Sequence, residues 1–181
     1  AKFAKKGVKL IGLSCDSVSE HNAWSEDVLA IKNHHAGFLG SLIDKAEDLL
    51  GLAGTDLGFP LIADEKREIA SLLGMAGQQA EADMPASAHG LFVIAPDKTN
   101  RATLLYPMTS GYSFAEVLRL VDSLLLTNDQ TVATPGNWRP GDRVVVPPGV
   151  ETEKAKEQFA NLEVKQVPSG EGYLRYVDCP G

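Results

Sequence analysis

The sequence has little cysteine: only Cys15 and Cys179 occur among its 181 residues, and they lie near opposite ends of the chain. They form no Cys-x-x-Cys pair and no cysteine–histidine cluster with the spacing of a zinc site. We therefore predict no metal site and no cofactor. Such sparse use of cysteine favours a reducing compartment inside the cell, either the cytosol or the interior of an organelle.

Runs of positive charge and long apolar segments are also missing. No run of Lys or Arg exceeds the pair Lys5–Lys6, and the formal net charge is −7. This composition lacks the basic surface with which proteins bind nucleic acid. The longest apolar stretches, such as "GLFVIA" and the leucines at 124–126, are too short to span a bilayer. Neither nucleic-acid binding nor a membrane-spanning segment is expected.

The first third of the chain shows a strand followed by a helix. Residues 8–14, "VKLIGLS", are apolar on both faces, which is typical of a central strand covered by helices on either side. Ser17 or Ser19 can cap the next helix, which we expect to end near residue 33 and to carry Trp24, Val28 and Ile31 at helical spacing on one face. Residues 1–7, "AKFAKKG", resemble the last turn of an earlier helix closed by a glycine, so we expect the natural chain to start before residue 1.

Strand and helix signals continue to alternate after this helix. Residues 34–57 are rich in Gly and Leu and predict a loop with a short amphipathic helix over roughly residues 40–52. "FPLIAD" predicts a short strand, and "EKREIASLLGM" predicts a helix that Gly74 ends. "GLFVIAP" and "ATLLYP" predict a hairpin closed by "PDKTN", and "SFAEVLRLVDSLLLT" predicts an amphipathic helix capped by Ser113.

This order of elements predicts an α/β layer fold with a mixed sheet. After "TPGNWRPGD" the composition changes, and short segments such as "RVVVPP", "ETEKAKEQFA" and "GYLRYV" follow. We therefore expect a core domain over residues 1–132 and a small α+β domain over residues 133–181.

Six separated blocks of the sequence occur in the order typical of a one-cysteine (1-Cys) peroxiredoxin. They are "KLIGLSCDSVSEHNAW", "FPLIADEKREIASLLGM", "MPASAHGLFVIAPDK", "LLYPMTSGYSFAEVLRLVDSLLLT", "VATPGNWRPGD" and "PSGEGYLRY". The chain resembles this family over nearly its whole length, with residues 34–57 longer than is usual. The resemblance implies a thioredoxin-like three-layer core with a mixed sheet, a C-terminal dimerisation domain, and reduction of hydroperoxides by a cysteine thiolate.

The resemblance also implies where the attacking cysteine of the family lies. In the family it occupies a Pro-x-x-x-Thr/Ser-x-x-Cys motif at the start of a helix, where the helix dipole stabilises a thiolate. Residues 1–6 resemble the end of that helix, which places the cysteine roughly a dozen residues before Ala1. Cys15 instead follows a strand and is expected to be a buried small hydrophobe, whereas Cys179 is expected to face solvent. Neither is predicted to be catalytic.

Two further positions of the family site differ in this sequence. The family activates peroxide with an arginine in an "MPxxAR" segment and a second arginine after the "LYP" strand. Here "MPASAHG" has His89 at the first position, and "TSGYSF" has Tyr112 at the second. Histidine is mostly neutral near pH 7 and tyrosine carries no positive charge there, so neither replaces a guanidinium. The resemblance therefore predicts a degenerate peroxide site.

Other residues of catalytic type receive structural interpretations. His34 and His35 lack a nearby cysteine or carboxylate cluster, so they predict exposed histidines rather than metal ligands. His21 and Trp24 lie one helical turn apart and are expected to pack. Asp97 matches the aspartate of a Ser–His–Asp set with which some relatives hydrolyse phospholipids. The matching Ser and His precede residue 1, so that activity is not expected from these residues alone.

Two functions follow from these patterns. The first is a peroxidase-inactive, peroxiredoxin-like protein that serves as a structural or interaction component of a homodimer or larger assembly. The alternative is a fragment of an active 1-Cys peroxiredoxin, an antioxidant hydroperoxide reductase whose cysteine lies upstream of residue 1. Without the family's N-terminal segment, a sheet edge beside Leu10, Ile11 and Leu13 would be uncovered, so we do not expect a stable free monomer.

Overall fold

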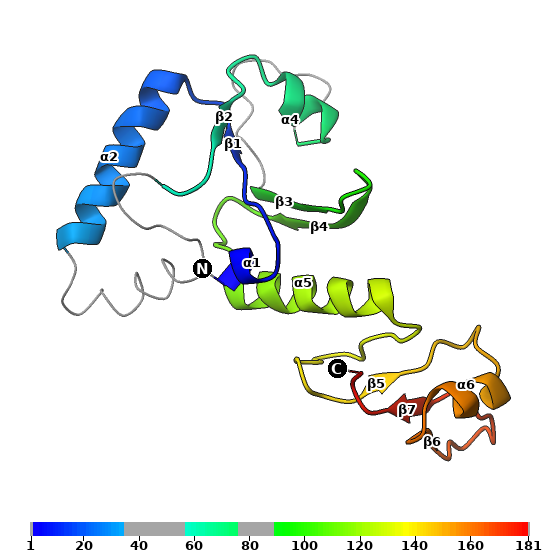
Figure 1. The fold of residues 1–181 in the computed structure, drawn as a ribbon. Helices are drawn as coiled ribbons and strands as arrows, with labels where there is room; N and C mark the ends of the chain where they lie inside the picture. The colour runs from blue at the N-terminus through cyan, green and yellow to red at the C-terminus, as the bar shows by residue number, and fades with distance from the viewer. Residues whose placement is uncertain (1, 35–56, 76–88, 181) are drawn as a thin grey trace. The chain divides into compact units, whose positions relative to one another are not determined.

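The computed structural model of the protein describes residues 2–34, 57–75 and 89–180 (Figure 1). The chain divides into two compact units. The N-terminal unit contains Ala1–Leu91 and Leu104–Gly111, and the C-terminal unit contains Phe92–Thr103 and Tyr112–Gly181. The elements alternate between helix and strand in the first half of the chain, as the sequence predicts. The boundary between residues 132 and 133 that the change in composition indicates stays a prediction.

The N-terminal part contains a parallel strand pair. Its elements are α1 (Lys2–Lys5), β1 (Gly12–Ser14), α2 (Val18–His34), β2 (Leu61–Ala63) and α4 (Glu68–Leu72). β1 and β2 pair in register from Gly12 opposite Leu61 to Ser14 opposite Ala63, and α2 packs against β2. Each of these elements was predicted, although β1 is shorter than the apolar run that contains it. Residues 35–56, with the loop and short helix predicted there, lie outside the described residues.

Local chemistry accounts for the start of α2. The Ser17 hydroxyl accepts a hydrogen bond from the Glu20 backbone N–H at 3.3 Å, and the Ser17 N–H donates to Oε2 of Glu20 at 2.7 Å. This reciprocal arrangement is a capping box, so Ser17 rather than Ser19 caps the helix. Hydrogen bonds from the Ser17 hydroxyl and N–H lower the pKa of Glu20 below its ordinary value.

Gly12 leaves room for the Leu61 side chain where β1 meets β2. A Cβ atom on Gly12 would lie 2.3 Å from Cδ2 of Leu61, which is too close for any side chain unless Leu61 moves. Gly74 has φ +71° and follows α4, so it ends that helix in the left-handed conformation that glycine adopts at low cost.

The predicted hairpin is confirmed. β3 (His89–Ile94) and β4 (Asn100–Tyr106) form a two-stranded sheet, and the Ala95 N–H donates to the carbonyl oxygen of Thr99 at 2.9 Å in the turn. Asp97 shapes this turn, because its Oδ1 accepts from the Thr99 hydroxyl at 2.7 Å and from the Thr99 N–H at 2.9 Å. These hydrogen bonds lower the pKa of Asp97.

The chain continues with a capped helix and a small antiparallel sheet. The Ser113 hydroxyl caps α5 (Phe114–Asp129) by accepting from the Glu116 N–H, as predicted. β5 (Val144–Val145), α6 (Thr152–Gln158), β6 (Glu163–Val164) and β7 (Arg175–Val177) follow, and β7 is the central strand of the order β5–β7–β6. Val132, Trp138, Val144, Val146, Ala155 and Val177 are the buried core of this part.

The expectation that helices cover both faces of the first strand is wrong. Ile11, just before β1, is 66% exposed, so this segment is not covered on both sides in the part of the chain that the structure describes. On α2, Trp24 and Ile31 are each about half exposed, although they share a helical face with the half-buried Val28. The helical spacing identifies a common face correctly, but burial depends on what packs against that face.

None of the described helices is both long enough and apolar enough to cross a membrane.

Candidate functional site

The end of β1 carries a polar cluster that sequence patterns did not indicate. Ser14 is the last residue of β1, and its Oγ lies 2.6 Å from Nε2 of His21 on the first turn of α2. The same hydroxyl donates to Oδ2 of Asp16 at 2.8 Å and accepts from the Asp16 N–H at 3.2 Å. The loop from β1 to α2 is short, so it brings these three side chains together.

The donor in the contact between Ser14 and His21 depends on the tautomer of the histidine. A hydroxyl has one proton, and Ser14 uses it for the contact with Asp16. The 2.6 Å contact is therefore satisfied when His21 carries its proton on Nε2 and donates to Ser14. His21 is 8% exposed, so this hydrogen bond holds the orientation of a buried imidazole.

This arrangement differs from a hydrolytic triad. In a triad the acid holds the histidine, and the histidine accepts the proton of the serine. Here the acid contacts Ser14 instead of the histidine, and the Ser14 hydroxyl donates to that acid. The geometry favours an orienting role for Ser14 over a nucleophilic one.

Cys15 lies between Ser14 and Asp16 and is exposed, so the expectation that it is buried is wrong. β1 ends at Ser14, and the hydrogen bonds between the two neighbours of Cys15 turn the chain away from the sheet. No hydrogen bond from the described residues reaches its sulfur, and reactive thiolates usually have such donors or a cation nearby. The prediction that Cys15 is not catalytic remains a prediction.

Cys179 also differs from its expectation. It is partly buried and packs against the core cluster that contains Trp138 and Val177, whereas the sequence predicted a solvent-facing thiol. The C-terminal segment after β7 folds back on this small core, because its few apolar side chains are needed to cover it. That Cys179 is not catalytic likewise remains a prediction.

The two positions where the resemblance expects arginine lie in different units. His89 is the first residue of β3 and is half-buried, and Tyr112 immediately precedes the cap of α5 and is also half-buried. Each is described within its own unit, so a shared site remains a prediction. The segment before His89, residues 76–88, lies outside the described residues.

The remaining candidates are the histidines His21, His34 and His35, with Trp24. His34 is the last residue of α2, and His35 lies outside the described residues. His21 is buried as expected, but Trp24 is 51% exposed, so the expected packing of this pair is only half correct. Within the described ranges, no group of three or more His, Cys, Asp or Glu side chains could hold a metal ion.

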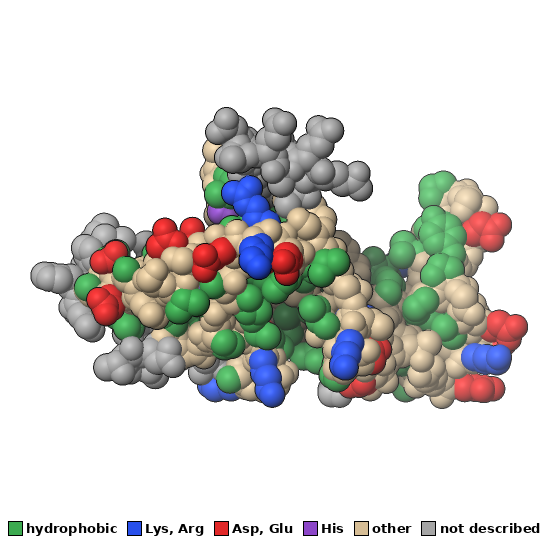
Figure 2. All heavy atoms as spheres, turned by 90° about the horizontal axis from the view of Figure 1, so that it is seen from above, with side chains coloured by type: hydrophobic (Ala, Val, Ile, Leu, Met, Phe, Trp, Pro, Cys, Tyr) green, Lys and Arg blue, Asp and Glu red, His purple; other side chains and the backbone are tan. Residues whose placement is uncertain are grey.

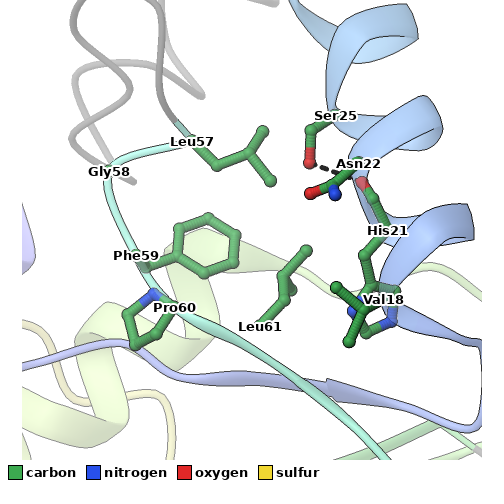
Figure 3. A pocket seen from close by; sticks show the side chains of 9 residues that line it. All are labelled: Val18, His21, Asn22, Ser25, Leu57, Gly58, Phe59, Pro60 and Leu61. Carbon is green, nitrogen blue, oxygen red and sulfur yellow. Dashed lines mark hydrogen bonds between the residues drawn. The ribbon is translucent and has the colours of Figure 1, made fainter.

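A pocket of about 530 Å³ opens between the N-terminal half of α2 and the segment that leads into β2 (Figure 3). The helix contributes Val18, His21, Asn22 and Ser25, and residues 57–61 form the opposite wall. Figure 3 shows Asn22 and Ser25 extending from α2 toward Leu57. The Ser25 hydroxyl donates to the His21 carbonyl oxygen at 2.7 Å, whereas the Asn22 side chain makes no hydrogen bond among the described residues.

Comparison with known families gives two matches. Residues 1–102 match the AhpC/TSA family, and residues 126–161 match the C-terminal domain of 1-Cys peroxiredoxin. Peroxiredoxin-6 of Rattus norvegicus is 42% identical over 183 residues, which cover 99% of this chain and 74% of the relative. Peroxiredoxin-6 of Gallus gallus is 41% identical over 182 residues with the same coverage.

Solved structures agree with these matches. A cysteine-to-serine mutant of the peroxiredoxin 6 of Arenicola marina superposes with a TM-score of 0.79 at 46% identity, over 99% of this chain and 74% of that one. A yeast mitochondrial 1-Cys peroxiredoxin gives a TM-score of 0.74 at 33% identity, over 98% and 73%. This likeness confirms the thioredoxin-like α/β fold class that the sequence predicted.

Proposed function

The chain belongs to the 1-Cys peroxiredoxins of the AhpC/TSA family, and we propose that it is a structural or interaction component of a dimer or larger assembly. We propose further that residues 1–181 do not themselves reduce peroxides. The observation that carries this second part is the pair His89 and Tyr112 at the positions where the resemblance expects arginines.

The physical argument concerns fixed positive charge. A guanidinium stabilises both a thiolate and the charge that develops as the peroxide O–O bond breaks, because it is protonated at every physiological pH. A histidine supplies such a charge only when protonated, and a tyrosine supplies none near pH 7. Losing both groups removes the main electrostatic contribution to this reaction.

Exposed apolar side chains support the assembly part of the proposal. Large hydrophobic residues of the N-terminal unit that are at least half exposed include Ile11, Val18, Trp24, Ile31 and Leu72. Figure 2 shows hydrophobic side chains between charged ones on the face that it presents. Apolar surface of this kind is frequent where a protein meets a partner. The match to a 1-Cys peroxiredoxin C-terminal domain, which the resemblance associates with dimerisation, favours a second copy.

A second candidate is an active 1-Cys peroxiredoxin that includes a peroxide-attacking cysteine outside residues 1–181. The observation that favours it is the identity of about 42% to peroxiredoxin-6 proteins over almost the whole chain. The yeast mitochondrial relative resolves its thiol through glutathione and thioredoxin systems. If this candidate is correct, the same reductants are expected to serve this protein.

Peroxide consumption by residues 1–181 tests the inactive candidate. The same assay on a longer natural chain that includes the attacking cysteine tests the second candidate, which predicts fast peroxide reduction there. Stopped-flow measurements on residues 1–181 with hydrogen peroxide and an alkyl hydroperoxide should show only the rate of a free thiol. Cys15→Ser and Cys179→Ser are the controls, and fast turnover that either substitution abolishes would disprove the inactive candidate.

Sedimentation and thermal melting of residues 1–181 test the assembly. A soluble monomer with a sharp cooperative transition would contradict that part of the proposal.

A further inference from the structure

The pocket between α2 and residues 57–61 has two chemically different walls. Leu57, Phe59, Pro60 and Leu61 supply an apolar wall, and Leu57 is 4% exposed. The helix wall carries the side chains of Asn22 and Ser25, which Figure 3 shows directed toward Leu57. Pockets that bind small molecules commonly combine a mostly apolar lining with a few polar groups that orient the ligand.

The helix wall, which carries Asn22 and Ser25, has hydrogen-bonding capacity that the described residues do not use. A primary amide offers two donor protons and an acceptor oxygen, and the Asn22 side chain makes no hydrogen bond within the described part of the chain. The Ser25 hydroxyl donates its proton to the His21 carbonyl oxygen, so it can only accept a hydrogen bond from a ligand in the pocket. A ligand amide complements both groups, since it presents a donor and an acceptor together.

The size of the pocket limits the occupant. About 530 Å³ lies within the range of small-molecule sites, which is roughly 300–1,000 Å³. The described residues that line it include no Asp, Glu, Lys or Arg, so among them an ionic ligand would lose hydration without gaining an ion pair with such a side chain. Phe59 offers a ring against which an aromatic group can pack.

We propose that this pocket is a binding site for a small, uncharged molecule that carries an aromatic or branched apolar group and an amide. The apolar group lies against Phe59 and Leu61, and the amide bonds to the Asn22 side chain. Neither His89 nor Tyr112 is among the residues that line the pocket, and this proposal does not depend on the proposed function.

The position of His21 makes the site well ordered on one side. Its imidazole is held by Ser14 at 2.6 Å, and its carbonyl oxygen holds Ser25 at 2.7 Å. The first turn of α2 is therefore tied to the end of β1 before a ligand arrives. Such preorganisation lowers the entropy cost of binding.

Ligand-observed NMR titrations of the full chain test the proposal, with N-acetyl-phenylalanine amide as the probe. N-acetylglycine amide keeps the amides and lacks the ring, and 2-phenylethanol keeps the ring and lacks the amides. We expect saturable binding of the probe and binding at least about fivefold weaker for each analogue.

Variants locate the site on α2. Asn22→Ala should weaken binding of the probe by roughly fivefold to tenfold, because it removes the hydrogen bonds to the amide. Asn22 is exposed, so the substitution should leave the melting temperature nearly unchanged. Glu26→Ala, at an exposed α2 residue outside the pocket, is the matched control and should bind like the unsubstituted chain.

Three results would each overturn the proposal. They are no saturable binding of N-acetyl-phenylalanine amide, equal binding by Asn22→Ala and the unsubstituted chain, and equal affinity for the probe and 2-phenylethanol.

Discussion

The hydroxyl oxygen of Ser14 lies 2.6 Å from Nε2 of His21, and this contact joins the end of the first strand to the first turn of α2. The partners are seven residues apart, and His21 is buried. A buried imidazole nitrogen that loses its partner keeps the cost of desolvation without the hydrogen bond.

Ser14→Ala should therefore lower the free energy of unfolding by about 1–2 kcal/mol. Chemical denaturation followed by circular dichroism measures the change. Ser19→Ala is the matched control, because the Ser19 hydroxyl is exposed and contacts only the Ser17 hydroxyl, at 3.0 Å. Equal effects of the two substitutions would show that the contact with His21 contributes nothing to stability.

Arg175→Lys should destabilise the C-terminal unit by about 2–3 kcal/mol. The guanidinium of Arg175 is 3% exposed and donates to the carbonyl oxygens of Val150 at 2.6 Å and Pro147 at 2.9 Å. One ammonium group does not have the two-branched geometry that reaches both carbonyls. Trp138 is buried in the same unit, so its fluorescence during urea unfolding reports the change.

Arg139→Lys is the control for this experiment, since Arg139 is exposed. It should change the free energy of unfolding by less than about 0.5 kcal/mol. A comparable loss in both variants would contradict the role assigned to Arg175.

Glu163→Gln should reduce stability at pH 7 but not at pH 3. Hydrogen bonds from Lys165 and Arg143 lower the pKa of Glu163 below its ordinary value near 4.5. A carboxyl whose folded-state pKa is lowered stabilises the fold above its unfolded-state pKa. That contribution is lost as the pH falls below about 4.5 and through the folded-state value.

Melting temperatures of both proteins between pH 7 and pH 3 measure this convergence. Because Glu163 is solvent-exposed, about 1 M salt should shrink the difference at pH 7. Glu171→Gln is the control, since Glu171 is exposed and has no ion pair among the described residues. A difference between Glu163→Gln and the unsubstituted chain that persists at pH 3 would refute the electrostatic explanation.

His89→Arg together with Tyr112→Arg should raise the rate of peroxide reduction by roughly tenfold or more in a chain that also contains the family's attacking cysteine. Each change restores a permanent positive charge. Peroxide consumption in the stopped flow measures the rate, and circular dichroism checks the fold. His89→Gln with Tyr112→Phe is the control, because it changes both positions without adding charge. No gain with an intact fold would show that these are not the arginine positions.

Local signals determined most of the secondary structure. The capping box formed by Ser17 and Glu20 marks the start of α2, Ser113 marks the start of α5, and "PDKTN" marks the hairpin turn. Each signal depends on residues within a few positions of one another, so the sequence alone contains the cause. Six ordered blocks of sequence likewise sufficed to identify the family, and the family matches over residues 1–102 and 126–161 confirm it.

Tertiary structure alone decided which of these residues are covered. Helical spacing put Trp24 and Ile31 on one face, but both are half exposed, and the thiol of Cys15 is exposed while that of Cys179 is partly covered. The hydrogen bond between Ser14 and His21, and the hydrogen bonds from Arg175 to the carbonyl oxygens of Val150 and Pro147, also join residues from separate segments. Periodicity shows which side chains share a face, whereas burial and hydrogen bonding depend on which distant segment packs against it.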